Sequence, residues 1–101
     1  MSEEPPAIVP AEVDARLADG WVLLDVRTDA EWEQAHVPGA LHVPMDQVVA
    51  RLDEIGERVV CMCGAGSRSA RVTAYLNASG REAVNLDGGI SAWAAEGRRL
   101  V

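Results

Sequence analysis

The stretch that decides the fold of this chain reads Val59-Val60-Cys61-Met62-Cys63-Gly64-Ala65-Gly66-Ser67-Arg68-Ser69-Ala70-Arg71. It begins with an unbroken apolar run, the pattern of a strand that is buried on both faces. Small residues and two glycines then interrupt the run, and apolar side chains return at helical spacing at Val72, Tyr75 and Leu76. The pattern therefore predicts a strand, a tight loop and a helix, with Cys63 at the mouth of the loop.

The predicted loop is suited to hold a negative charge. A turn of this kind directs several backbone N–H groups at one point, next to a helix N-terminus whose partial positive charge favours an anion. Only the thiolate form of a cysteine is a good nucleophile, and the loop amides, the helix end and Arg68 all favour that form. We therefore expect a depressed pKa for Cys63. This role requires N–H groups that point inward and a sulfur that solvent can reach.

Composition limits the class of protein. The chain has 101 residues, of which 49% are hydrophobic and 25% charged, so we expect one globular domain over 1–101 with a flexible lead over 1–7. The net charge of -7 argues against a nucleic-acid partner, which requires a basic face. No apolar run reaches the roughly 20 residues that span a bilayer, and the acidic N-terminus is unlike a basic signal peptide. We expect a cytoplasmic protein with no membrane partner.

The two cysteines do not form a structural framework. Cys61 and Cys63 are too few for a set of disulfides or for a zinc site, which usually needs four ligands. We therefore expect no metal and no cofactor, and we interpret His36 and His42 as turn and strand residues. Two-residue alternation places Cys61 on the same face as Cys63. Core packing is favoured for Cys61 over a role as a redox partner of Cys63.

Strands and helices alternate along the chain. Short or apolar strand patterns lie at 8–9, 21–26, 41–44, 59–63 and 82–86, and helical patterns follow Pro10, Thr28, Val48, Gly66 and Gly89. This alternation predicts an α/β fold in three layers, with a central, mostly parallel five-stranded sheet and helices on both faces. Ligands bind beyond the carboxyl ends of such strands, where Asp25, Arg27, Cys63 and Asp87 are expected to meet.

Local signals define one helix more closely. Thr28 and Glu31 have the spacing of a capping box, in which the threonine caps the helix and the glutamate reaches back. The tryptophans at positions 21, 32 and 93 are interpreted as core or near-core anchors. A cation is unfavourable at a helix N-terminus, so Arg68 indicates an anion or a carboxylate as its partner.

Four sequence blocks, in a fixed order, carry a resemblance to a known family. They are Asp25-Val26-Arg27 with Glu31-Trp32; His36-Val37-Pro38-Gly39-Ala40 with Val43-Pro44; the loop Cys63-Gly64-Ala65-Gly66-Ser67-Arg68-Ser69; and Leu86-Asp87-Gly88-Gly89-Ile90 with Trp93. Together they resemble the single-domain rhodanese family of sulfurtransferases, over nearly the whole chain from about Val9 to Gly97. The resemblance implies the rhodanese-like version of the predicted α/β fold.

The resemblance also implies an activity. The Cys63 thiolate would attack the outer sulfur of thiosulfate or of a persulfide and carry it as a persulfide, and cyanide or a thiol would then accept it. Gly64, Ala65, Gly66, Ser67, Arg68 and Ser69 would form the substrate cradle. Asp25 would brace the loop by hydrogen bonding, and Arg27 would pair with Glu31 or face the site. Oriented amides in a site that excludes water stabilise such an anionic sulfur.

Several alternatives stay open at this level. Gly64 and Ala65 are neutral where family members active on thiosulfate often carry a basic residue, so a persulfide or a protein could be the donor. A binding module without catalysis, or a persulfide carrier for a partner protein, is the rival to an enzyme. Related cysteine phosphatases have five residues between cysteine and arginine, whereas Cys63 and Arg68 are separated by four. The shorter ring favours sulfur over phosphate.

Overall fold

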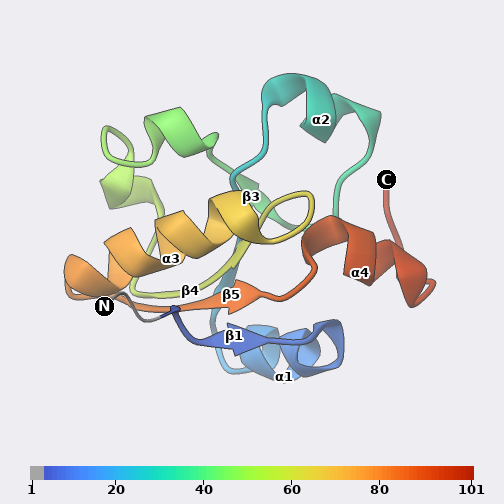
Figure 1. Ribbon diagram of the computed structural model, residues 1–101, viewed down its shortest axis with the longest axis horizontal. Helices are drawn as coiled ribbons and strands as arrows, with labels where there is room; N and C mark the ends of the chain where they lie inside the picture. The colour runs from blue at the N-terminus through green and yellow to red at the C-terminus, as the bar shows by residue number, and fades with distance from the viewer. Residues whose placement is uncertain (1–3) are drawn as a thin grey trace.

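Five parallel strands form the centre of the molecule, as the computed structural model of residues 4–101 shows (Figure 1). The strands are β1 (Ala7–Ile8), β2 (Val22–Asp25), β3 (Leu41–His42), β4 (Arg58–Met62) and β5 (Glu82–Leu86). Their order across the sheet is β1-β5-β4-β2-β3, and each neighbouring pair is parallel. The predicted α/β fold with a parallel five-stranded sheet is confirmed.

Helices cover both faces of this sheet. They are α1 (Val13–Ala18), α2 (Asp29–Gln34), α3 (Ser67–Ala78) and α4 (Gly89–Ala95), with 3-10 turns η1 (Pro10–Glu12), η2 (Met45–Gln47) and η3 (Leu52–Glu54). Figure 1 shows α3 on one face and α1 on the other. One hydrophobic cluster lies on each side: the first contains Val72 and Leu76 of α3, and the second contains Val13 of α1 and Trp93 of α4.

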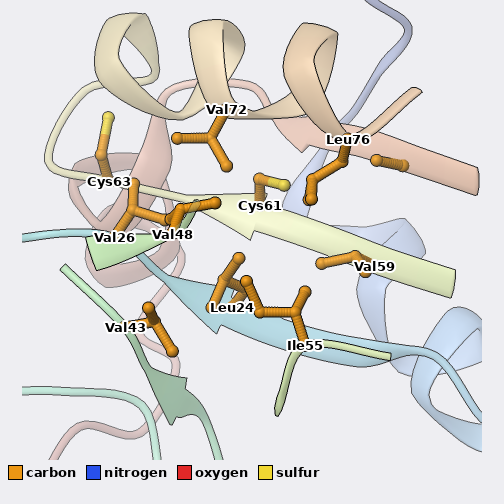
Figure 2. Packing of buried hydrophobic residues seen from close by; sticks show 11 residues of the cluster. Leu24, Val26, Val43, Val48, Ile55, Val59, Cys61, Cys63, Val72 and Leu76 are labelled. Carbon is orange, nitrogen blue, oxygen red and sulfur yellow. The ribbon is translucent and has the colours of Figure 1, made fainter. Parts of the chain in front are cut away.

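The central strand contributes to both clusters. Val59 and Cys61 of β4 belong to the α3 cluster, which Figure 2 shows, whereas Val60 and Met62 belong to the opposite one. All four side chains are fully buried. This burial accounts for the unbroken apolar run, because a strand between two helical layers has no solvent-facing side.

One predicted helix is wrong. The chain through Val48, Val49 and Ile55 forms the turns η2 and η3 with an irregular segment between them. Val48 and Ile55 are buried, but Val49 is 67% exposed. The apolar residues therefore mark two separate contacts with the core, and their spacing is not that of a continuous helical stripe.

The first strand begins one residue earlier than expected. Residues 1–3 of the predicted lead lie outside the residues that the structure describes. The carbonyl of Pro6 already accepts a hydrogen bond from the Asn85 N–H at 2.8 Å, and Ala7 lies opposite Asn85 in the register of β1 and β5. The edge strand thus begins at Ala7 rather than at Ile8.

Aromatic side chains take two kinds of position. Trp21 and Trp93 are buried, as expected. Trp32 is half-buried, and its ring stacks on the rings of His36 and His42 with centroid distances of 3.8 and 4.6 Å.

Among residues 4–101, no helix combines the length and apolar character needed to cross a bilayer.

The sheet brings the predicted site together at one edge. Because the strands are parallel, β2, β4 and β5 end on the same side, and Asp25, Cys63 and Asp87 lie at or just after those ends. In Figure 1 the loop that follows β4 lies beside the start of α4. Hydrogen bonds join these two segments, so they form a continuous rim.

Candidate active site

Main-chain and side-chain donors surround the sulfur of Cys63. The N–H groups of Gly66 and Ser69 lie 3.1 and 3.4 Å from Cys63 Sγ, and Ser69 Oγ lies 3.3 Å from it. Gly66 has a φ of +110°, a left-handed conformation that favours glycine and turns the chain into α3. The loop therefore curls its donors inward around one sulfur atom, as the sequence predicted.

The acidities of the two cysteines are shifted in opposite directions, Cys63 by these donors and Cys61 by burial. Burial opposes ionisation of Cys63, but the Ser69 hydroxyl and the N–H groups of Ser69, Gly66 and Ala65 outweigh it and lower the pKa of this thiol. Burial in the core raises the pKa of Cys61 to about 12. Cys61 is thus a packed thiol, and Cys63 is the cysteine that is prepared to carry charge.

The second requirement for the site is not met in this resting structure. Figure 2 shows the Cys63 sulfur pointing away from the hydrophobic cluster, toward the loop. Cys63 is nevertheless 0% exposed, whereas Gly64 is half-buried and Ala65 is exposed. The thiol lies within the ring of donors and is closed off from solvent at rest. A sulfur donor can reach it only after the Cys63 side chain or its surroundings shift.

Asn85 is a site residue that sequence reasoning missed. It lies on β5, is 8% exposed, and donates from Nδ2 to the Gly66 carbonyl at 3.0 Å. This bond fixes the amide orientation, so Asn85 Oδ1 faces Ser69 Oγ at 2.6 Å. The Ser69 hydroxyl therefore donates its single proton to Asn85 at this short distance, while Cys63 Sγ lies within its reach at 3.3 Å.

The start of α4 fixes the loop from the other side. The N–H groups of Ile90 and Ser91 donate to the carbonyls of Cys63 and Gly64 at 2.8 and 3.1 Å. These contacts require a very close approach, since a Cβ on Gly89 would lie 2.3 Å from the Cys63 carbonyl oxygen. The sequence placed the Asp87-Gly88-Gly89 turn on the rim but did not reveal this clamp.

The predicted brace from Asp25 to the loop is wrong. Within residues 4–101, every hydrogen bond to the Asp25 carboxylate comes from Arg27, and the shortest, from Nη2, is 2.8 Å. Both side chains are buried, and Arg27 also donates to the carbonyls of Glu31 and Ala35. Asp25 and Arg27 therefore hold α2 against the sheet, because Arg27 binds both the Asp25 carboxylate and the carbonyls at the end of that helix.

Arg68 has the carboxylate partner that its position indicated. Its Nη1 and Nη2 atoms donate to the two oxygens of Glu31 at 2.7 and 2.9 Å. The bond from Arg68 is the main reason that the pKa of Glu31 is lowered to about 2, and it also raises the pKa of Arg68. Glu31 completes the predicted capping box with Thr28 as well, so one carboxylate has two functions.

Comparisons with known proteins identify the family. A family model described as the Rhodanese-like domain matches residues 9–96. The chain belongs to the rhodanese-like domain family. It is 44% identical over 91 residues to a protein of Allochromatium vinosum named "Sulfurtransferase", covering 85% of each chain.

Other relatives of this rhodanese-like chain extend the comparison. YrkF of Bacillus subtilis, whose name describes a sulfur carrier protein, is 32% identical over 70% of the chain, which spans 40% of YrkF. The crystal structure of a rhodanese-related protein from Thermoplasma volcanium superimposes with a TM-score of 0.87 at 23% identity, covering 95% of this chain and 97% of that one. The likeness to the Thermoplasma structure establishes the fold.

The predicted site residues of this rhodanese-like domain divide into three groups. Gly66 and Ser69 contact the Cys63 sulfur, and the Ala65 N–H contributes to its acidity. The Gly64 carbonyl binds α4, the Arg68 guanidinium binds Glu31, and exposed Ser67 begins α3. Asp25 and Arg27 form a separate buried pair. The roles of all three groups in catalysis or in binding a substrate stay predictions.

Proposed function

We propose that this protein transfers sulfane sulfur from thiosulfate or a persulfide to a thiol or cyanide, through a persulfide on Cys63. The observation that carries the proposal is the ring of donors from Gly66 and Ser69 around a thiol of lowered pKa. The sulfurtransferase name of the Allochromatium relative supports the same class of reaction.

The reaction needs no redox cofactor, because both steps are displacements at sulfur. In the first, the Cys63 thiolate attacks the outer sulfur of the donor, and the donor S–S bond breaks. Its electron pair leaves on sulfite from thiosulfate, or on a thiolate from an organic persulfide. In the second, the acceptor attacks the terminal sulfur of Cys63, and the electron pair of that S–S bond restores the Cys63 thiolate.

The ring has a distinct task in each step. It stabilises the Cys63 thiolate before attack, and afterwards it offers N–H donors to the anionic terminal sulfur of the persulfide. The extra sulfur also requires room, so the surroundings of the buried Cys63 must shift during turnover. Asp25 and Arg27 support this arrangement indirectly, since they hold the helix that carries Glu31, the partner of Arg68.

A persulfide carrier for a partner protein is the second candidate. Two observations favour it: the burial of Cys63 at rest and the carrier name of YrkF. A carrier would accept sulfur on Cys63 but release it only to a partner that makes the buried sulfur accessible. An enzyme would also release it to small acceptors such as cyanide.

Mass spectrometry of the intact protein tests both candidates. Incubation with thiosulfate, and separately with a small organic persulfide, should add one sulfur to Cys63. Cyanide should remove it. Cys63→Ala should show no adduct, whereas Cys61→Ala, which changes the other buried thiol, should still form it. Absence of an adduct with both donors contradicts the proposal, and an adduct that cyanide and small thiols leave in place assigns the carrier role.

A further inference from the structure

The Glu31 carboxylate binds Arg68, the cationic side chain of the reactive loop. Arg68 lies in the first turn of α3, and both of its terminal nitrogens are bound by the Glu31 carboxylate. This two-point pairing matches the planar guanidinium to the carboxylate and neutralises its charge. Glu31 therefore offsets the positive charge of Arg68 before an anionic substrate arrives, although Cys63 also contributes to the raised pKa of Arg68.

Within residues 4–101, the other charged side chains that line the hollows beside the loop are acidic. A hollow of about 460 Å³ beside Arg68 is lined by Asp29 and Asp46. A second hollow, of about 230 Å³, reaches the other side of the loop and is lined by Glu4 and Asp87. The charged side chains that line these two hollows are thus four carboxylates and Arg68. Arg71, one turn further along α3, lines a different hollow with Tyr75.

We propose that Glu31 determines donor specificity, by neutralising Arg68 so that the site prefers organic persulfides to thiosulfate. This inference rests on the proposed sulfur transfer through Cys63. It identifies Glu31 as a positioning residue, because it acts through Arg68 and does not touch the reacting sulfur. The sequence indicates an anionic partner for Arg68 but does not identify Glu31, since 37 positions separate the two residues.

The charge of each donor explains the preference. Thiosulfate brings two negative charges to the Cys63 thiolate, and both remain on the departing sulfite. A simple alkyl persulfide brings at most one negative charge, and the thiolate that it releases carries a single charge from the electron pair of the broken S–S bond. Without a free cation, the rim of carboxylates repels the thiosulfate complex more strongly. Releasing one unit positive charge near the dianion should accelerate its reaction roughly tenfold.

Glu31→Gln isolates this charge effect. Glutamine at the third helical position still completes a capping box with Thr28, so the start of α2 is retained. Glu33→Gln is the matched control, because exposed Glu33 lies on the same helix and its replacement removes the same unit of charge. Glu31→Gln combined with Arg68→Gln removes the released cation.

The test measures the rates at which thiosulfate and the persulfide of 2-mercaptoethanol add sulfur to Cys63. Glu31→Gln should raise the ratio of the thiosulfate rate to the persulfide rate roughly tenfold at low ionic strength. Glu33→Gln should leave the ratio unchanged, and the double variant should return it to the wild-type value. The wild type supplies a measurement without any substitution: added salt should raise its thiosulfate rate relative to its persulfide rate.

The outcomes separate this inference from the proposed function. If both donors modify wild-type Cys63 but Glu31→Gln and Glu33→Gln give the same ratio, the specificity role is overturned and sulfur transfer stands. The specificity role is also overturned if salt lowers the relative thiosulfate rate of the wild type. If neither donor modifies the wild type, both proposals fail.

Discussion

Replacing Gly89 with alanine should destabilise the protein by about 2–4 kcal/mol and strongly slow persulfide formation on Cys63. The new Cβ would lie 2.3 Å from the Cys63 carbonyl oxygen and 2.8 Å from the carbonyl carbon and oxygen of Gly64. These are backbone atoms of the active loop, so they cannot rotate away as a side chain could. The Ile90 N–H would lose its bond to Cys63, and the ring of donors would shift with it.

Gly97→Ala is the control for this substitution. Gly97 has a φ of +73°, comparable to the +57° of Gly89, but a Cβ there would meet nothing within 4 Å. The Gly97→Ala variant should therefore lose only about 1 kcal/mol of unfolding free energy, the cost of the left-handed conformation. The reactivity of Cys63 should be normal. Urea unfolding and the rate of persulfide formation measure the two effects. Equal losses for both variants would show that α4 does not clamp the loop.

Asp25→Asn should cost about 3–5 kcal/mol of unfolding free energy. Asp25 is fully buried and Arg27 is 5% exposed, so the substitution leaves a guanidinium in the interior without its counter-charge. Arg27 also binds the carbonyls of Glu31 and Ala35, and its displacement should loosen α2. Urea unfolding measures the loss of stability, and faster amide hydrogen exchange in α2 identifies where it acts.

An exposed ion pair provides the comparison for this experiment. Arg58 and Asp19 lie 3.2 Å apart, but the Asp19 side chain is 74% exposed. Asp19→Asn should cost no more than about 1 kcal/mol, because water compensates both charges. A loss from Asp25→Asn as small as that from Asp19→Asn would mean that the buried pair does not secure α2.

The features that sequence predicted correctly are encoded by neighbouring residues. The apolar run ending at Cys63, the glycines and the helical spacing after them define strand, loop and helix, and the structure has all three. The capping box of Thr28 and Glu31 is equally local. Parallel strands then bring their carboxyl ends together, so the place of the site followed from the fold.

The features that sequence missed depend on distant residues. Ser69 and Asn85 meet because β5 lies beside β4, and Glu31 meets Arg68 because Arg27 holds α2 in position. The burial of Cys63 depends on how closely the loop folds over its own sulfur, which residue spacing does not reveal.

The expected helix at 48–55 fails for a related reason. Its apolar residues contact the core from two short turns, and the spacing of the sequence alone does not distinguish such contacts from a helical stripe.

Titration of the Cys63 thiolate by its ultraviolet absorbance tests most directly whether the loop holds a charged sulfur. Burial raises the pKa of Cys61 to about 12, so Cys63 should account for the thiolate signal below that range. We expect its midpoint to lie below the ordinary thiol value of about 8.5 and to disappear in Cys63→Ala. A wild-type midpoint at or above that ordinary value would contradict the account, because the inward donors would then not stabilise the anion.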